Sequence, residues 1–479
     1  MEITKKPYKR RVLPFESLFI HQPGVIVGFI AGITGKIDEY KFANAVKKLV
    51  SLYPILRSKL TVDKYGEEWI EEAPFEIPMR TVPRIDDDTW KRVFEEAEKY
   101  PIDLEKGPFY EFILVKSETK AEIIFRGHHM MTDGIAMTRI LDLILQFMRD
   151  PNMTIKTYKE EELPNGKTLR KCVKPKLTLK QKIQNTWDDY LLFPLINLEW
   201  KRTKLKLSKE DIVNSHKIYM SNLKHLMLTD AFTERETTDI FNECKKHNIT
   251  INSCLATAFL AVRSEVDPEH ENNRQYVAVD LRRHLGENAH QAINCYASTL
   301  TTNFAYDGKK SFWENAENYH KLIKADLDAC AEVTHVKNFS HLPTSFVWAT
   351  SLAGRMQGLP DKYKDHALFK KIGPKSIHVV AVFMRVSLKF GPTFCITNLK
   401  RGRFTYDYGD LKLDSFIMSP SFVIYPPVSL LLSVITVNNK LTMSYHAVKP
   451  INEAKIDYDK ILNDVKCRFK EFMTNDIFK

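Results

Sequence analysis

The chain has 479 residues, 44% of them hydrophobic and 27% charged, and this balance is that of a soluble globular protein. At this length two domains or two fused halves are the natural expectation, and the 17 glycines and 22 prolines form no biased run that would indicate extended disorder. A formal charge of +11 favours anionic partners such as phosphates or membrane surfaces, but no basic stretch with interleaved aromatics indicates a nucleic-acid-binding module.

The first part of the chain alternates strand and helix patterns. The run 24–35 predicts a strand, and 36–60 carries apolar residues at helical spacing, with Pro54 after its main body. Three further strands are expected at 67–72, 110–117 and 121–130. The apolar spacing of 134–149 predicts another helix, with Thr132 or Asp133 near its start.

Between about 151 and 225 the composition becomes charged and contains prolines, which indicates a connection between two halves. Within it, residues 187–203 have an apolar, aromatic middle flanked by charge. Such a segment can lie on a membrane surface or a lipid substrate, but packing on its own protein is the commoner outcome. The longest apolar run, 190–198, is far shorter than the roughly 20 residues that span a bilayer.

The second part again mixes helices and strands. Two helices are expected within 233–266, the second capped near Thr250 or Asn252, and another at 458–473. Strands are expected at 275–285, 296–306, 378–388, 393–400 and 429–447, the last containing a hairpin turn. We therefore predict two α/β sandwich halves, 1–175 and 225–479, joined by a crossover linker at 176–224.

The seven cysteines are an odd number and include no CxxC pair, so they indicate neither a disulfide framework nor a zinc ligand set. Cys254 and Cys395 lie in apolar runs and are expected in the core. The chain starts without an apolar signal segment, and a cytoplasmic, reducing location is the expectation.

The segment 121–144 ends an apolar strand with two histidines, His128 and His129, and Asp133 follows four residues after the second. A histidine at such a strand end can act as a general base near neutral pH. Alternatively, one histidine is a hydrogen-bonded core residue and the other caps the turn. A metal site is disfavoured, because His129 and Asp133 would be only two ligands and no third is apparent.

The form of residues 128–134, HHMMTDG, resembles the HHxxxDG active-site motif of the condensation-domain and chloramphenicol-acetyltransferase-like superfamily. Other segments are similar to that superfamily in its order along the chain, namely 19–60, 249–263, 277–285, 293–304 and 396–404. The resemblance implies two chloramphenicol-acetyltransferase-like α/β halves with a tunnel at their interface. It is nearest to free-standing alcohol O-acyltransferases, since the plant-type DFGWG signature and any carrier or adenylation segment are absent from this sequence.

In such families the second histidine of the motif is the base, which is His129 here. The resemblance makes Asp133 a structural brace that pairs with an arginine of the second half. Arg282 is the matching position and Arg283 the less favoured one. It also implies that Gly134 leaves room for substrate and that His128 anchors the loop.

The resemblance places the segment around Thr397 and Asn398 across the tunnel, and both residues are candidates to stabilise the oxyanion or to line the tunnel. Alternatively, they serve sheet packing and turn formation. Lys400 stands where the family has a glycine. Three basic residues are candidates for the phosphates of coenzyme A, namely Lys400, Arg401 and Arg403.

The implied reaction is direct transfer of an acyl group from acyl-CoA, a co-substrate rather than a bound cofactor, to an alcohol. An amide-forming or condensation-type enzyme and a non-catalytic CoA- or acyl-binding relative remain alternatives. We expect a monomer that binds neither a metal ion nor nucleic acid. Peripheral contact with a membrane is a further possibility that the sequence leaves open. The motif does not distinguish O- from N-acylation, the acceptor or the acyl-chain length.

Overall fold

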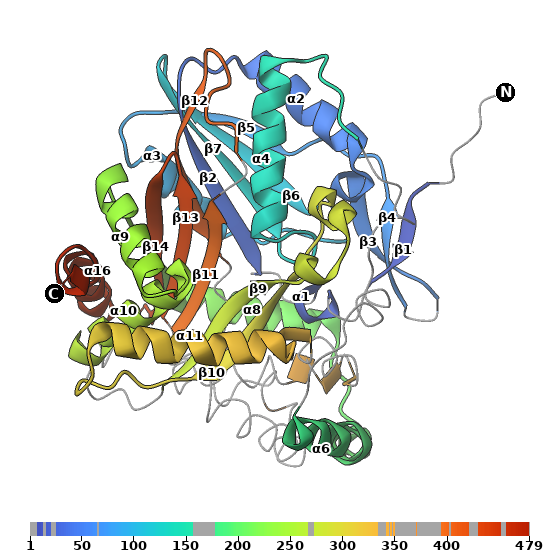
Figure 1. Cartoon of the computed structure of the whole chain (residues 1–479). Coiled ribbons are helices and arrows are strands. Elements are labelled where there is room, and N and C mark those ends of the chain that lie inside the picture. Colours follow the sequence, from blue (N-terminus) through green and yellow to red (C-terminus); the bar gives the residue numbers. More distant parts are fainter. Residues whose placement is uncertain are drawn as a thin grey trace.

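Figure 1 presents a computed structural model of the whole chain. The structure describes residues 7–12, 16–20, 25–64, 67–156, 178–266, 273–333, 342–343, 345–346, 348–349, 370, 394–401, 404–420, 430–451 and 457–478. The strand expected at 378–388 lies outside these residues. Within them, two mixed sheets, each with helices on it, form the two halves, which confirms the predicted α/β class.

The first half is built on a five-stranded sheet. Its order is β12 (Lys412–Ser419), β2 (Ile26–Thr34), β7 (Lys120–His128), β6 (Tyr110–Lys116) and β5 (Met79–Pro83). Only the β5–β6 pair is parallel. The helices α2 (Glu39–Leu52) and α4 (Gly134–Arg149) lie side by side across one face (Figure 1).

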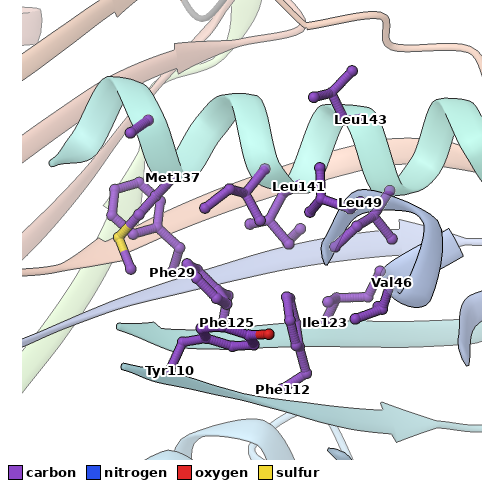
Figure 2. Close-up of a cluster of buried hydrophobic side chains, with 14 of the residues drawn as sticks. Phe29, Val46, Leu49, Tyr110, Phe112, Ile123, Phe125, Met137, Leu141 and Leu143 are labelled. Carbon is purple, nitrogen blue, oxygen red and sulfur yellow. The ribbon is translucent and has the colours of Figure 1, made fainter. Parts of the chain in front are cut away.

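The core of this half forms where α2 and α4 meet the sheet. Figure 2 shows Met137 and Leu141 of α4 pointing down onto Phe29 and Phe125 of the strands. The helical spacing of apolar residues gives α4 one continuous buried face, and alternation along β7 sends Phe125 to that side. Ile124, on the other face of β7, packs in a second cluster against α3 (Thr89–Glu98). Because β7 is buried on both faces, its end is held rigidly.

Smaller elements complete this half. A three-stranded sheet contains β1 (Lys9–Arg11), β4 (Glu68–Glu72) and β3 (Ser58–Val62). The short helix α1 (Ser17–Ile20) follows β1, and the 3-10 turn η1 (Pro54–Arg57) follows α2. The Asp38 side chain caps α2 by accepting from the backbone N–H groups of Tyr40 and Lys41, which is why the helix begins there.

The second half is built on a six-stranded sheet. Its order is β10 (Ala297–Asn303), β9 (Arg274–Asp280), β11 (Phe394–Arg401), β13 (Leu430–Val437), β14 (Lys440–Pro450) and β8 (Leu223–Ala231). Four helices carry the buried side chains of its core, namely α9 (Glu234–Lys246), α10 (Ile251–Val266), α11 (Phe312–Asp328) and α16 (Tyr458–Thr474). Short helical turns are η4 (Leu281–His284), η5 (Glu287–Gln291) and η7 (Asp476–Phe478).

Local sequence signals determine where two helices begin and where a hairpin turns in this half. Thr233 caps α9 in a capping box, and the Thr250 hydroxyl accepts from the backbone N–H of Ser253 at the start of α10. Asn438 and Asn439 both have positive φ, of 47° and 59°, as the hairpin between β13 and β14 requires. Cys254 is buried as predicted, whereas Cys395 is half-buried.

The two halves are not separate along the chain. The sequence assigns 412–419 to the second half, yet β12 pairs with β2 at the edge of the first half's sheet. From there β12 contacts β13 and β14, and the Ser444 hydroxyl donates to the Met418 carbonyl over 2.5 Å. The sequence analysis predicts no strand at 412–419, and because strand pairing is a long-range property, a local pattern could not have assigned this segment to the first sheet.

The connection between the halves is largely helical. It contains α6 (Leu179–Trp187), the π-helical turn η3 (Asp188–Leu192), α7 (Phe193–Thr203) and α8 (Lys209–Asn222), which leads directly into β8. The α6 helix lies apart from both sheets, at the bottom of Figure 1. None of the helices in the described residues is long and apolar enough to cross a membrane.

Candidate active site

The candidate site begins where β7 ends. His128 is the last residue of the strand, and its backbone N–H donates to the Phe109 carbonyl over 2.8 Å. Its side chain is fully buried, and Nδ1 accepts from the backbone N–H of Met130 over 3.3 Å. His128 therefore ties the turn to the sheet and is not in a position to meet a substrate.

His129 points the other way, as successive residues of a strand do. Its backbone N–H donates to the Val25 carbonyl over 2.9 Å, and its ring is partly accessible to solvent. The Phe19 ring, from α1, stacks on the imidazole with a centroid distance of 4.9 Å and an interplanar angle of 12°. The Cys295 sulfur, from the second half, lies 3.6 Å from Nδ1.

The tautomer of His129 follows from its hydrogen bond. Nδ1 lies 3.0 Å from the carbonyl oxygen of Thr132. A carbonyl only accepts, so Nδ1 carries the proton and Nε2 keeps a lone pair. No group in the described part of the chain hydrogen-bonds to Nε2. The geometry thus presents the nitrogen that a general base needs.

The electrostatic surroundings keep His129 neutral. Burial lowers the pKa of the imidazole from its ordinary value, and this outweighs the opposing effects of the hydrogen bonds at His129 and Thr132 and of the Asp133 carboxylate. At neutral pH the ring is therefore unprotonated. Burial also raises the pKa of the neighbouring Cys295 thiol well above its ordinary value, so that this sulfur stays a neutral thiol.

Asp133 joins the two halves. Its Oδ1 accepts from the backbone N–H of Ala136 over 2.9 Å, which caps α4. Its Oδ2 accepts from Arg282 Nη1 over 2.7 Å and from the backbone N–H of Tyr296 over 2.6 Å. Both charged side chains are almost completely buried. Each oxygen of the carboxylate is thus engaged by donors that hold the motif loop to α4 and to the second half.

Arg282 has a partner on every side of its guanidinium group. Besides Asp133, Nη1 contacts Asp280 Oδ1 at 3.2 Å, Nε donates to the Ala289 carbonyl and Nη2 to the Asn294 carbonyl. Its guanidinium carbon also lies 4.9 Å from the centre of the Tyr296 ring. The full set of partners explains how a buried cation is tolerated there.

Arg283 does not contact Asp133. It pairs with the buried carboxylate of Glu332, which also lies 2.7 Å from His284 Nε2. Ligand-type atoms of His284, Cys330 and Glu332 all lie within 4.8 Å of one another, a grouping absent from the sequence analysis because its members are far apart in the chain. The Arg283 cation already neutralises this carboxylate, which leaves less charge for a metal ion.

Gly134 lies against a residue of the second half. The resemblance implies that it leaves room for substrate, and this stays a prediction; a methyl group at this position would overlap the side chain of Leu399. The space over Gly134 is therefore filled by Leu399, at the end of β11. The smallness of glycine here lets a strand of the second half approach the motif.

The same contact brings Thr397 and Asn398 toward the motif loop, since they precede Leu399 on β11. The Asn398 Oδ1 accepts from the backbone N–H of Lys400 over 2.7 Å, so the amide orientation is set. Its Nδ2 is buried and has no hydrogen-bond acceptor among the described residues. Thr397 is half-buried and pairs with Ser433 of β13.

Of the three cations considered for phosphate binding, Lys400 is exposed and has a positive φ of 59°. The left-handed conformation at Lys400 is the one for which the family has a glycine. The side chain of Arg401 and all of Arg403 lie outside the described residues.

A narrow cavity of about 40 Å³ lies between the halves. Its lining includes Ile26 and Arg126 of the first sheet, Tyr219 of the connecting helix α8, and His225 and Val448 of the second half. Arg126 lies two residues before His128, so this cavity borders the strand that carries the motif.

Beside this cavity two histidines and a carboxylate form a chain across the interface. His225 Nδ1 lies 2.9 Å from Glu98 Oε1, and its Nε2 lies 3.0 Å from His446 Nδ1. Burial, and then the charge of His225, hold the pKa of His446 well below its ordinary value. Sequence reasoning missed these three residues, because only the fold brings α3, β8 and β14 together.

The comparisons with known proteins agree with this architecture. Residues 2–159 match the family model described as condensation domain. The chain is 22% identical over 148 residues to a nonribosomal peptide synthetase of Aspergillus ustus, which is 29% of this chain and 4% of that protein. It is 28% identical over 124 residues to tyrocidine synthase 3 of Brevibacillus parabrevis, 26% of this chain and 2% of that protein. The chain thus spans only a few per cent of the length of these relatives.

Solved structures resemble the chain over nearly its whole length. The first condensation domain of the calcium-dependent antibiotic synthetase has a TM-score of 0.61 at 11% identity, covering 98% of this chain and 97% of that one. Polyketide synthase associated protein 5 from Mycobacterium tuberculosis has a TM-score of 0.59 at 15% identity, covering 97% and 98%. The trichothecene 15-O-acetyltransferase of Fusarium sporotrichioides has a TM-score of 0.61 at 12% identity, covering 97% of this chain and 95% of that one. At these identities the likeness establishes the fold.

Proposed function

Since the chain has the two-half fold of condensation domains and chloramphenicol-acetyltransferase-like enzymes, we propose that it is an acyltransferase with His129 as its general base. The proposed donor is a coenzyme A thioester and the proposed acceptor an alcohol. The O-acetyltransferase among the similar structures supports a hydroxyl acceptor for this fold.

One observation carries the proposal, namely the tautomer of His129. Its Nδ1 proton is held by the Thr132 carbonyl at 3.0 Å, and burial keeps the ring neutral. The remaining lone pair on Nε2 is free to accept a proton from a bound hydroxyl. The rigid end of β7 and the Phe19 ring hold the imidazole in one orientation.

In the proposed reaction the acceptor hydroxyl attacks the thioester carbon while Nε2 takes its proton. The carbonyl oxygen becomes an oxyanion, the carbon–sulfur bond then breaks, and the leaving thiolate takes the proton back from the imidazolium. The products are an ester and free coenzyme A, and His129 ends neutral as it began. Base catalysis of this kind contributes roughly 10²–10⁴-fold.

The Asn398 side chain is the proposed oxyanion donor. Its buried Nδ2 has no acceptor in the described part of the protein, although a buried N–H group normally has one. The contact of Leu399 with Gly134 supports this role, because it brings the end of β11 to the motif. An oxyanion formed beside Nδ2 would supply the missing acceptor.

An amine acceptor is the second candidate. The match of residues 2–159 to the condensation-domain model, together with the peptide synthetases among the relatives, favours it. The same base serves both acceptors, so the site geometry accommodates either. In this case the donor thioester would be carried on a phosphopantetheine arm, the group that also forms the end of coenzyme A.

The experiment incubates the purified protein with acetyl-, octanoyl- and palmitoyl-coenzyme A, each with a panel of alcohols and amines. Thiol release and product mass are measured. We expect ester formation that His129→Ala lowers by at least about a hundredfold. The matched control is His247→Ala, because this ring is likewise stacked on an aromatic, Trp313, at a centroid distance of 4.0 Å.

Amide products without esters would favour the second candidate. Thermal stabilisation by coenzyme A with no product from any acceptor would instead indicate a binding protein without activity. Equal activity in His129→Ala and His247→Ala would refute the assignment of the base.

A further inference from the structure

The helical segment from α6 to α7 exposes an unusual number of large apolar side chains. Of the fourteen large hydrophobic residues that are exposed in the described part of the protein, eight lie between 179 and 198. The others, such as Tyr40 and Ile85, occur singly or at chain ends. Trp187 is 57% exposed and Leu179 is 75% exposed. A contiguous exposed apolar surface of this kind marks an interaction site.

The spacing of these residues places them along one side of the segment. Six of them recur at intervals of four and then three residues and are called the apolar stripe here, namely Leu179, Ile183, Trp187, Leu191, Leu195 and Leu198. Residues at these intervals share one face of a helix. The stripe continues through η3, so that it extends over about 20 residues, or about 30 Å of helix.

The opposite side of α7 is attached to the protein. Phe193 and Trp200 are seven residues apart and both are buried. The Trp200 ring packs against Phe346 with a centroid distance of 5.3 Å, and its Nε1 donates to the Ser345 hydroxyl over 3.0 Å. The helix is thus anchored by one face and presents the stripe outward with the other.

Cations outnumber carboxylates along the stripe and gather at its C-terminal end. Residues 178–206 contain six lysines and arginines against three carboxylates. Four exposed cations follow the stripe and are called the basic flank here, namely Lys201, Arg202, Lys204 and Lys206. Lys182, within α6, is exposed as well. This charge favours a partner that offers an apolar layer bordered by anionic groups.

We propose that the stripe lies in the surface of an anionic lipid bilayer, parallel to the membrane plane. Leucine, isoleucine and tryptophan side chains would enter the boundary between headgroups and acyl chains, and the basic flank would contact lipid phosphates. A second copy of the chain fits less well, because two stripes packed together would bring their cations close to one another. This inference does not depend on the proposed acyl transfer.

The test measures binding of the full chain to lipid vesicles by flotation. Vesicles of phosphatidylcholine alone are compared with vesicles that also contain phosphatidylserine, at low and high salt. We expect binding to the anionic vesicles that weakens with salt. The double variant Ile183→Asn, Leu195→Asn should bind roughly a hundredfold more weakly, because two buried apolar side chains are lost from the lipid.

The matched control for the stripe is Tyr40→Asn with Ile85→Asn, which removes two still more exposed apolar residues elsewhere and should leave vesicle binding unchanged. For the charge, Lys201→Gln, Lys204→Gln and Lys206→Gln together should reduce binding by at least about tenfold. The control for this variant replaces three exposed lysines of the second half, Lys245, Lys309 and Lys321, with glutamine.

Three results would overturn the proposal. The first is equal binding of the stripe variant and its control. The second is a large fall in melting temperature in the stripe variant, which would mean that the stripe packs within the protein. The third is a dimer in solution that the stripe variant dissociates, which would make a second copy the partner.

Discussion

Replacing Asp133 with alanine would remove the one carboxylate that links the motif loop to the second half. Arg282 would lose its shortest ion-pair contact, of 2.7 Å, and the pair is almost completely buried. Breaking a buried pair costs about 3–5 kcal/mol. Asp280 remains 3.2 Å from Arg282 Nη1, which favours the lower end of that range.

Two further losses accompany this change. The backbone N–H of Tyr296 would lose its acceptor, which costs about 1–3 kcal/mol in a buried site. The helix α4 would lose its cap, worth about 1 kcal/mol. These contributions overlap, so we expect the free energy of unfolding to fall by about 4–6 kcal/mol.

Urea denaturation followed by circular dichroism measures this difference. Asp38→Ala is the matched control, because Asp38 caps α2 in the same way but is exposed and has no buried ion pair. It should lower stability far less, because only a helix cap is lost. The double variant Asp133→Ala, Arg282→Met should be more stable than Asp133→Ala alone, since the stranded cation is gone. If Asp133→Ala cost no more than Asp38→Ala, the ion pair would not hold the halves together.

Four more predictions concern single side chains of the site and the interface. Only neutral His129 can act as the base, and burial lowers the pKa of this histidine. The kcat/KM should therefore rise with pH, with its midpoint below about pH 6.5, and should be constant near pH 7. A midpoint above pH 7 would contradict this. Gly134→Ala should lower stability by about 1–3 kcal/mol through overlap with Leu399, and thermal melts should show a smaller cost for the same substitution in a Leu399→Ala background. Asn398→Ala should reduce kcat by about 10²–10³-fold without lowering the melting temperature, whereas an unchanged kcat would exclude the amide as oxyanion donor. The pKa of His446 is well below its ordinary value in the folded protein, so the unfolded chain binds more protons than the folded protein as the pH is lowered from about 7.5 to about 5.5. The free energy of unfolding should therefore decrease over that pH range, and the decrease should be smaller in His446→Leu.

Local patterns in the sequence predict most of the elements around the site. The apolar run of β7, the helical spacing of α4 and the capping side chain of Asp133 are all short-range signals, and the structure contains each of them. The partner of Asp133 is a different kind of prediction. It came from the resemblance to a family, because Arg282 lies 149 positions after Asp133 and no local signal marks it, and the structure places the two side chains in contact.

Side chains that reach the site from distant segments were not predicted. Phe19 and Cys295 both touch His129, and Leu399 fills the space over Gly134. None of them belongs to a spaced motif, so their roles follow only from how the strands pair and pack. The strand β12 and its pairing with β2 were not predicted for the same reason, since the stability of a strand pair depends on both partners.

The position of β12 has a practical consequence for dissecting this protein. A fragment that stopped at the end of the condensation-domain match, residue 159, would keep β2 but lose the strand that covers it. The backbone N–H and C=O groups on one side of Ile26–Thr34 would then be left unpaired, and such an exposed strand edge recruits strands from other molecules. Such a truncation should therefore give insoluble material. A soluble first half calls for a graft in which residues 412–419 are joined behind residue 156 through a glycine-rich tether.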